Sequence, residues 1–318
     1  MSHVLVSGAN GFVGRALCPA LLAAGHAVTG VVRRAGHISG GVSEWVDASI
    51  DFAGIDAQWP SSLKVDCVVH LAARVHVMRD DAADPDAAFH ATNVEGTLRL
   101  ARAARNHGAR RFVFVSSVKA QAEEDNGRPL REDDEPAPED AYGRSKLAAE
   151  RALSAYSDES GLDVVIVRPP LVYGPEVRAN FLRLMEGVAH RVPLPLGMVD
   201  SRRSMVYVGN LVDALMHCAL DPLAARQTFN VADSEVLSVT ELVRALMRHL
   251  QKSSLLLPVP PAWLRIAGLL TGRRAQVERL VGSLELDTTR IHTVLGWQPP
   301  FSTEKGLAET TRWYRSTH

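Results

Sequence analysis

The chain has 318 residues, 46% of them hydrophobic, and a formal net charge of -1 at neutral pH. This length is enough for a sizeable core, organised as one large unit with a smaller lobe. The near-zero charge excludes a strong overall attraction to nucleic acid or to an anionic membrane. Cys18, Cys67 and Cys218 are too few and too far apart for a metal site, so we expect no metal, buried reduced thiols and a cytoplasmic protein.

The first elements predict a strand, a glycine turn and a helix. The apolar run His3–Val6 leads into three glycines spaced as GxxGxxG, and an amphipathic pattern follows over Val13–Ala24. In this setting backbone N–H groups and the helix N-terminus face a pyrophosphate, whereas the glycine spacing alone would also suit an ordinary tight turn. The predicted dinucleotide contacts are Gly8, Asn10, Gly11, Phe12, Val13 and Gly14.

The second strand, Ala27–Val32, ends in Arg33 and Arg34 without an acidic residue. An acid at this position accepts hydrogen bonds from the ribose hydroxyls of NAD, whereas an arginine suits the 2′-phosphate of NADP. We therefore expect NADP as the preferred cofactor and NAD as the alternative. Two solvated arginines at the start of a loop are the non-functional interpretation.

Short β-rich runs alternate with helical patterns as far as residue 168, which predicts a Rossmann-type α/β fold with a doubly wound parallel sheet. The acidic loop Glu123–Asp140 interrupts this alternation, and we expect most of its charges to be solvated. The expected strands are Val4–Ser7, Ala27–Val32, Trp45–Val46, Cys67–Leu71, Phe112–Ser116 and Val164–Arg168, and the later helices Asp86–His107 and Ala141–Tyr156.

Tyr142 and Lys146 are four residues apart in a helical pattern, so their side chains share one face. The ammonium beside the phenol would favour its ionised form and make it useful as an acid or base. Ser116 and Ser117 end an apolar strand, where ligands of open α/β sheets bind. A hydroxyl there could hold a substrate oxygen, although capping a helix is the alternative role of either serine.

Prolines gather after Arg168, and the alternation of strands and helices stops. We expect a dinucleotide-binding domain over 1–168 with a return segment near 204–232, including a strand at Thr228–Val231. The remaining 169–203 and 233–318 would form the substrate lobe. The apolar stretch Leu255–Leu270 contains three prolines and an arginine, is too short to span a bilayer, and predicts a packed helix. No membrane insertion and no export signal are expected.

Several segments in this order resemble the extended short-chain dehydrogenase/reductases, the epimerase/dehydratase group that acts on nucleotide sugars. The glycine turn, the two serines and the Tyr142–Lys146 pair carry the resemblance over nearly the whole chain. Further matching segments are His70-Leu71-Ala72-Ala73, Asn93 in Thr92–Thr97, Arg168-Pro169-Pro170-Leu171-Val172-Tyr173-Gly174-Pro175 and Leu295-Gly296-Trp297.

The resemblance implies a role for each matching residue. Ser117, rather than Ser116, would orient the substrate, Tyr142 would be the acid or base, and Lys146 would also hold the nicotinamide ribose. Asn93 would support the lysine, although a helix kink is its alternative explanation. The other implied cofactor contacts are Asp47 at the adenine, with Asp51 as a competitor, and Leu71, Ala72, Ala73, Ser116 and Pro169.

The resemblance also implies a UDP-sugar substrate held by the second lobe. Arginine suits a diphosphate because its rigid fork bonds two oxygens at once, although each arginine alone is more often a surface charge. A homodimer and no nucleic-acid partner are expected. The implied substrate contacts are Asn180, Leu194, Leu196, Arg203 and Arg279.

The serine segment continues as Val118–Ala122, which departs from the usual family sequence and leaves the substrate subgroup open. Four segments resemble a bacterial branch that handles UDP-N-acetylhexosamines for surface polysaccharide (O-antigen) biosynthesis. They are Ser116–Lys119, Pro169–Pro175, Pro193–Gly197 and Gly282–Leu284. Reduction of a UDP-4-keto-6-deoxy-N-acetylhexosamine at C4 is the favoured reaction. A UDP-glucose or UDP-N-acetylglucosamine 4-epimerase is the alternative, and a non-catalytic dinucleotide-binding or sensing protein is the alternative outside enzymes.

Overall fold

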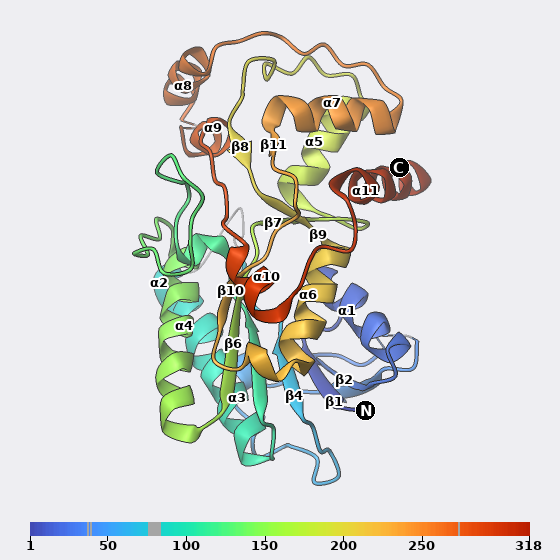
Figure 1. The fold of residues 1–318 in the computed structure, drawn as a ribbon, viewed down its shortest axis with the longest axis vertical. Helices are drawn as coiled ribbons and strands as arrows, with labels where there is room; N and C mark the ends of the chain where they lie inside the picture. Colours follow the sequence, from blue (N-terminus) through green and yellow to red (C-terminus); the bar gives the residue numbers. More distant parts are fainter. Residues whose placement is uncertain (37, 39, 76–83, 273) are drawn as a thin grey trace.

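The computed structural model describes residues 1–36, 38, 40–75, 84–272 and 274–318 and contains a seven-stranded parallel sheet (Figure 1). The strand order, β10-β6-β5-β4-β1-β2-β3, reverses beside β1, as in a doubly wound fold. The predicted fold class is therefore confirmed. The strands are β1 His3–Ser7, β2 Ala27–Val32, β3 Ser43–Val46, β4 Cys67–His70, β5 Arg111–Val115, β6 Asp163–Arg168 and β10 Thr228–Asn230.

Helices cover both faces of the sheet, which explains why its central strands are continuous apolar runs. On one face, Leu17 of α1 (Phe12–Ala23) and Leu211 of α6 (Val208–Leu220) belong to one buried cluster. On the other, Leu100 of α3 (Thr97–Asn106) and Leu153 of α4 (Ala141–Ser160) belong to a second. The three cysteines are free and buried in these layers.

The helix expected over Asp86–His107 has a π-helical segment in its middle. It consists of α2 (Pro85–His90), the π-helix η2 (Ala91–Gly96) and α3. Within η2, Asn93 is buried, and its carbonyl accepts a hydrogen bond from the Thr97 hydroxyl at 2.7 Å. Single π turns inside longer helices often mark functional sites, and this one follows the segment after β4.

Beyond β6 the chain builds a second group of elements above the carboxyl ends of the strands (Figure 1). The large buried cluster extends into this group, since it includes Val167 of β6 and Leu246 of α7. Division into two domains at residue 168 stays a proposal. The elements are β7 Leu171–Tyr173, α5 Ala179–Ala189, β8 Arg202–Arg203, β9 Met205–Tyr207, β11 Leu237–Ser238, α7 Val239–Leu250, α8 Pro261–Leu270, α9 Arg274–Val281, α10 Thr289–Leu295 and α11 Thr303–Thr317, with short 3-10 turns η1 Ile50–Phe52, η3 Val118–Ala120 and η4 Pro222–Ala224.

Helix α8 lies within the stretch expected to be a packed helix, and that expectation was wrong for most of its side chains. Leu264 packs against the large core and Gly268 is buried. Trp263, Leu269 and Leu270 are exposed. The helix therefore attaches to the protein by one narrow face. Among the described residues, none of the helices has both the length and the hydropathy needed to cross a bilayer.

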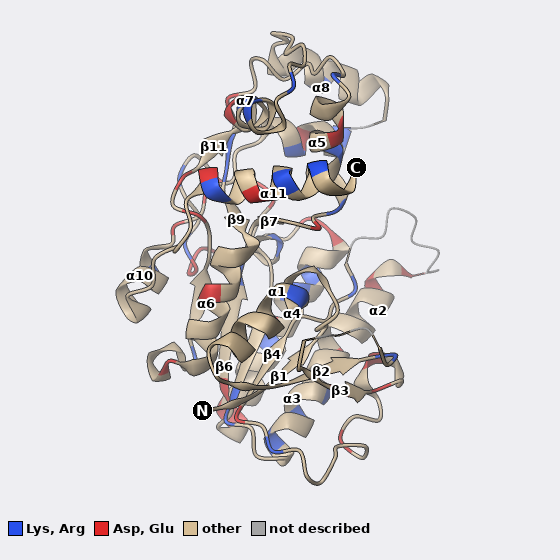
Figure 2. Cartoon of the chain, turned by 90° about the vertical axis from the view of Figure 1, so that its right-hand side faces the viewer, with Lys and Arg blue, Asp and Glu red and all other residues tan. Residues whose placement is uncertain are grey.

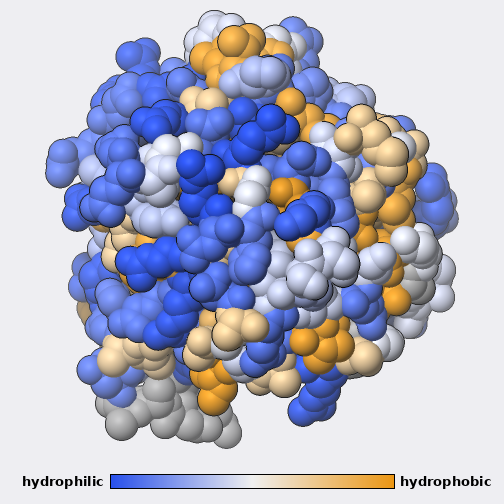
Figure 3. Space-filling model, turned by 90° about the horizontal axis from the view of Figure 1, so that it is seen from below, coloured by the Kyte–Doolittle hydropathy of each residue, from blue (hydrophilic) through white to orange (hydrophobic). Residues whose placement is uncertain are grey.

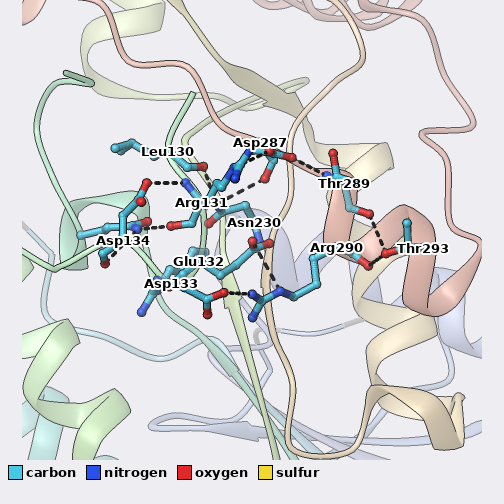
Figure 4. A network of polar contacts seen from close by, with 12 residues as sticks. Leu130, Arg131, Glu132, Asp133, Asp134, Asn230, Asp287, Thr289, Arg290 and Thr293 are labelled. Atoms are coloured by element: carbon cyan, nitrogen blue, oxygen red, sulfur yellow. Dashed lines mark hydrogen bonds and ion pairs between the residues drawn. The ribbon is translucent and has the colours of Figure 1, made fainter. Parts of the chain in front are cut away.

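The acidic loop before α4 is anchored by ion pairs at a few positions, while most of its charged residues are exposed, as expected. Glu132 is buried, accepts a hydrogen bond from the Asn230 N–H of β10 at 2.9 Å, and lies 3.6 Å from Arg290. Arg290 also pairs with Asp133, and Arg131 pairs with Asp287. Figure 4 shows this network joining the loop to β10 and α10.

Candidate active site

The glycine turn brings β1, α1 and the segment after β4 into close contact. Gly8 has a φ of 69°, and a Cβ atom there would lie 2.9 Å from the Ala72 nitrogen. A Cβ at Gly14 would lie 2.4 Å from the Gly8 carbonyl oxygen. Only glycine satisfies both positions without moving the backbone.

The N-terminus of α1 is open to an anion. Its first residues, Phe12, Val13, Gly14 and Arg15, include no acid, and no described side chain caps the helix at Gly11. The unpaired N–H groups and the helix dipole therefore point at the space beyond the glycine turn. A pyrophosphate is the ligand that this arrangement suits.

A second feature that suits a dinucleotide lies beside the end of β2. Asp47 is 2% exposed, and its N–H donates to the Val32 carbonyl at 2.9 Å. One carboxylate oxygen accepts from the Ser49 N–H at 3.0 Å, while Oδ2 is buried without a hydrogen-bond partner among the described residues. An amino group such as that of adenine would satisfy this oxygen, because a buried acceptor without a donor is costly.

The competing Asp51 lies in η1 with a φ of 50°, and its carbonyl accepts a hydrogen bond from Arg99. The geometry thus favours Asp47 at the adenine. Arg33 and Arg34 follow β2 directly and are exposed. All these cofactor assignments stay predictions, but the glycine cradle and the buried Asp47 oxygen fit a dinucleotide.

A buried hydrogen-bond chain, which the sequence did not reveal, fixes the strand ends around this space. His70 at the end of β4 is hydrogen-bonded to Ser7 at 2.6 Å and to Thr97 at 2.9 Å. Burial, and then the charge of Lys146, lowers the pKa of His70 to about 3, so the imidazole is neutral at physiological pH. The N–H groups of Leu71 and Ala72 donate to the Ser7 carbonyl and hydroxyl, respectively.

Asn93 connects the same region to the catalytic helix. Its carboxamide accepts from the Arg74 N–H at 2.8 Å and donates to the Arg74 carbonyl at 3.0 Å. It also donates to the Ser145 hydroxyl at 2.9 Å. The Asn93 side chain therefore reaches Ser145, the neighbour of Lys146 in the chain, and its support of the lysine stays a prediction.

The two serines have different surroundings. The Ser116 hydroxyl donates to Glu150, which forms a buried ion pair with Arg168 at 2.6 Å. The side chain of Ser116 thus belongs to a structural network. Pro169 is buried, and its carbonyl accepts a hydrogen bond from the Val118 N–H. The contacts of Ser116 and Pro169 with the cofactor stay predictions. Ser117 caps η3 by accepting from the Lys119 N–H at 3.2 Å, and its hydroxyl is near enough to Tyr142 to act against the rise in the pKa of that phenol.

Ser117, Tyr142 and Lys146 lie together at the carboxyl end of β5. The Lys146 ammonium donates to the Val115 carbonyl at 2.8 Å and lies 4.5 Å from the centre of the Phe114 ring. It is 5.9 Å from the centre of the Tyr142 ring. The i, i+4 spacing on α4 therefore places the two groups side by side, as the sequence indicated.

The protonation of this pair corrects the expectation that the lysine ionises the phenol. Burial, and then the charge of Asp140, raises the pKa of Tyr142 to about 12, despite the opposing hydrogen bond from Ser117. Burial lowers the pKa of Lys146 to about 7, and Glu150 opposes that change. Burial is the largest cause of both changes, so the phenol is protonated at neutral pH and the lysine loses its proton more readily than an exposed one.

Above this group lies a cluster of charges that we call the cleft cluster, formed by Lys119, Glu123, Asp140, Arg203 and Arg279. Lys119 lies 2.6 Å from Glu123 and 2.7 Å from Asp140. Arg279 of α9 approaches the same two carboxylates at 3.8 and 3.6 Å. Arg203 of β8 donates to the Glu123 carbonyl at 3.3 Å and to the Gly282 carbonyl at 2.8 Å.

The cleft cluster brings the two predicted diphosphate ligands together from β8 and α9. Burial lowers the pKa of Arg203, yet the guanidinium stays charged because nearby acids oppose the change. The sequence analysis assigned no role to Lys119, Glu123 or Asp140. The i, i+4 spacing of Lys119 and Glu123 and the position of Asp140 before α4 were the available signals.

The other predicted substrate residues are more dispersed. Asn180 is exposed at the start of α5. Leu194 is paired with Leu256 through backbone hydrogen bonds, and Leu196 is buried in the large core. The side chain of Leu196 is therefore directed into the core, and the substrate contacts of all three stay predictions.

A doubly wound sheet with a glycine-rich turn and a Ser-Tyr-Lys group beyond β5 defines a short-chain dehydrogenase/reductase. The model of the NAD dependent epimerase/dehydratase family matches residues 4–232. The chain belongs to this family of enzymes.

Three similar proteins illustrate the family. A UDP-glucose 4-epimerase of Vibrio cholerae is 39% identical, over 97% of this chain and 94% of the relative. An N-acetyl-alpha-D-glucosaminyl-diphospho-ditrans,octacis-undecaprenol 4-epimerase of Escherichia coli O157:H7 is 26% identical, over 98% and 95%. The crystal structure of a Thermotoga maritima UDP-glucose 4-epimerase with UDP-glucose superposes with a TM-score of 0.81 at 25% identity, covering 99% of both chains.

Proposed function

We propose that this protein catalyses hydride and proton transfer at C4 of a UDP-hexose, with 4-epimerisation as the overall reaction. The observation that carries the proposal is the ion pair between Arg279 of α9 and Asp140, which caps α4 two residues before Tyr142. Arg203 of β8 reaches the Glu123 carbonyl of the same cluster. The two epimerases named above, of Vibrio cholerae and Escherichia coli, are both named for a hexose joined to a diphosphate. That common part of the substrate is what an acid, a hydroxyl and paired arginines could recognise.

Each residue has a separate task in this chemistry. Ser117 orients the C4 oxygen, and Tyr142 gives a proton to that oxygen or takes one from it. Lys146 holds the ribose beside the phenol, and the glycine turn binds the pyrophosphate of NAD. The nicotinamide, when bound, supplies the hydride acceptor and donor.

The diphosphate would replace the acids of the cleft cluster as the partner of the arginines. Glu123 and Asp140 now neutralise Arg279. A bound diphosphate offers the same cations more oxygens in a geometry suited to the guanidinium fork. The substrate would thus exchange one set of ion pairs for another, which limits the cost of desolvating the arginines.

A C4 ketoreductase that uses NADPH is the second candidate. Its support is the end of β2, where Arg33 and Arg34 are exposed and no acid occupies the usual ribose position. A 2′-phosphate would find two cations there. A reductase also releases its oxidised cofactor after each turnover, whereas an epimerase retains it. A UDP-4-keto-6-deoxy-N-acetylhexosamine for surface polysaccharide is its proposed substrate.

One experiment separates the candidates. The protein is incubated with UDP-glucose, UDP-N-acetylglucosamine or the 4-keto-6-deoxy sugar nucleotide, while the nicotinamide absorbance is recorded and the sugar nucleotides are separated by chromatography. Interconversion of C4 epimers at constant absorbance supports the epimerase. Stoichiometric loss of reduced cofactor supports the reductase. Cofactor binding without either change would favour the non-catalytic alternative.

Arg33 and Arg34 provide an independent test of cofactor choice. The double alanine variant should lose affinity for NADP far more than for NAD, because only NADP carries the extra phosphate. Equilibrium binding of both cofactors by fluorescence measures this. An equal loss for the two cofactors would show that the arginines do not select between them.

A further inference from the structure

Helix α8 presents an unusual surface. Trp263, Ile266 and Leu270 follow the spacing i, i+3, i+7 and therefore lie on one face. That face is solvent-exposed, to 65% for Trp263 and 81% for Leu270, and Leu269 extends it. Exposed clusters of large apolar side chains mark interaction sites, whereas single ones need no explanation.

The surroundings of α8 are basic. Residues 252–277 contain four basic residues and no acidic one, although the whole chain has a net charge of -1. Figure 2 shows charges of both signs along α11, while α8 is mostly uncharged. The face at the opposite end of the molecule is mostly hydrophilic, with small scattered apolar areas (Figure 3).

Helix α8 is also close to the cleft cluster. α8 packs beside α9, and Arg265 of α8 bonds to Glu278 of α9 at 3.1 Å. The next residue, Arg279, belongs to the cleft cluster. In Figure 1, α8 and α9 form the upper edge of the molecule on the side of the loop before α4.

We propose that α8 is an interfacial helix that docks the protein on an anionic lipid bilayer. A tryptophan at one end of the helix, paired leucines at the other and basic residues nearby are the pattern of helices that lie in the headgroup region. A second copy of the chain suits this face less well. A two-fold contact would bring together two copies of a segment whose basic residues outnumber the one acid, Glu278, that pairs with Arg265, and like charges would repel.

Docking would leave the sheet and its glycine turn in water. The apolar face enters the boundary between headgroups and acyl chains, while the exposed Arg274 at the start of α9 would meet the lipid phosphates. The helix would not cross the bilayer. Because α9 links α8 to the cleft cluster, that cluster would lie close to the membrane surface.

The test uses the full-length protein with vesicles of phosphatidylcholine alone or mixed with phosphatidylglycerol, separated by flotation. We expect binding to the mixed vesicles that weakens as salt is raised. Leu269→Glu and Leu270→Glu should each reduce the bound fraction roughly tenfold, because each places a charge among acyl chains. Leu223→Glu is the matched control, since Leu223 is 63% exposed on η4, and it should bind normally.

Tryptophan fluorescence gives a second measurement that does not depend on these variants folding well. Lipids brominated on the acyl chains should quench the native protein, and Trp263→Phe should retain vesicle binding but lose most of the quenching. Failure of the native protein to bind the mixed vesicles would overturn the proposal. Equal loss in Leu223→Glu would also overturn it, as would a native dimer that Leu270→Glu converts to a monomer without any change in lipid binding.

Discussion

At the scale of single residues, the proposed catalytic group is in the protonation state of an acid. Tyr142 has a pKa raised to about 12, so it enters the reaction with its proton, and Ser117 is close enough to share the substrate oxygen. This suits the step in which a C4 carbonyl receives a proton. The reverse step requires the phenolate, and the positive charge of an oxidised nicotinamide would favour that form.

Tyr142→Phe should preserve the fold and cofactor binding and reduce turnover by roughly 10²–10⁴-fold, the usual contribution of a general acid. Turnover is measured by chromatography of the sugar nucleotides, and folding by thermal denaturation. The variant retains the ring that packs against Phe89, which makes it its own structural control. Turnover close to that of the native enzyme would remove Tyr142 from the mechanism.

Lys146 has a consequence for stability as well as for catalysis. Its pKa is lowered from 10.5 to about 7 in the folded protein, so between these values the unfolded chain binds more protons than the folded one. Its contribution to the free energy of unfolding therefore becomes more favourable as pH rises through this window, and it is unfavourable at and below pH 7.

Lys146→Met removes this dependence. Urea unfolding of both proteins between pH 7 and 9 should show the variant more stable at pH 7, with the advantage shrinking toward pH 9. The raised pKa values of the buried thiols make the free energy of unfolding fall as pH rises. Because both proteins contain the same thiols, this effect cancels in the comparison. A difference between the two proteins that does not change with pH would contradict the lowered pKa of Lys146.

At the scale of elements, the residue that caps α4, Asp140, links Tyr142 to α9. Asp140 caps the helix by accepting from the Gly143 N–H at 2.7 Å, and it pairs with Lys119 and Arg279. Its charge also contributes to the raised pKa of Tyr142. One carboxylate thus affects the helix, the cleft cluster and the acid.

Asp140→Asn should retain the cap, because asparagine caps as well as aspartate, while removing the charge. The pKa of Tyr142 should fall, and the alkaline limb of the profile of kcat against pH should move to lower pH. Asp140→Ala should shift the profile in the same direction and also lose about 1 kcal/mol of stability, the usual value of a cap. A profile unchanged in Asp140→Asn would show that this charge does not act on Tyr142.

The strands were predictable from the sequence because buried parallel strands are continuous apolar runs, and β2 was placed at its observed bounds. The glycine turn and the Tyr142–Lys146 pair were also found, since short-range spacing determines them. The π-helix was not predictable, because it contains an asparagine whose partners, Arg74 and Ser145, are far away in the chain. The pairing of Glu132 with Arg290 likewise depends on long-range contacts. The burial of α8 was wrongly predicted, because an apolar composition does not show which other elements cover a helix.

At the scale of the whole molecule, the cleft cluster is where the part of the chain around α9 meets the part around β5 and α4. Its cations converge on Glu123 and Asp140. The distance between the part around α9 and the part around β5 and α4 therefore depends on the charges of these residues. In the proposed function, the diphosphate of the substrate, rather than its sugar, would lie at the contact between these two parts.

Arg279→Ala should weaken binding of UDP roughly 10–100-fold, since a hydrogen bond to a charged group contributes about 1.5–3 kcal/mol. Affinity for the dinucleotide should change little, because Arg279 lies away from the glycine turn. Titration calorimetry with UDP and with NAD measures both. Arg248→Ala is a surface control, because Arg248 pairs with Glu304 on α7 and α11, and a matching loss of UDP affinity there would argue against a specific role for Arg279.

The place of β10 in the sheet also constrains how the protein is made. Its partner, β6, ends at Arg168, yet β10 begins only at Thr228, after β7, α5, β8, β9 and α6 have been added. During synthesis on the ribosome, β6 is therefore an open edge while all of these segments emerge, and open edges invite pairing with other chains. Protection by chaperones should matter most in that interval, and a fragment that stops after β6 should aggregate, however complete its cofactor residues are.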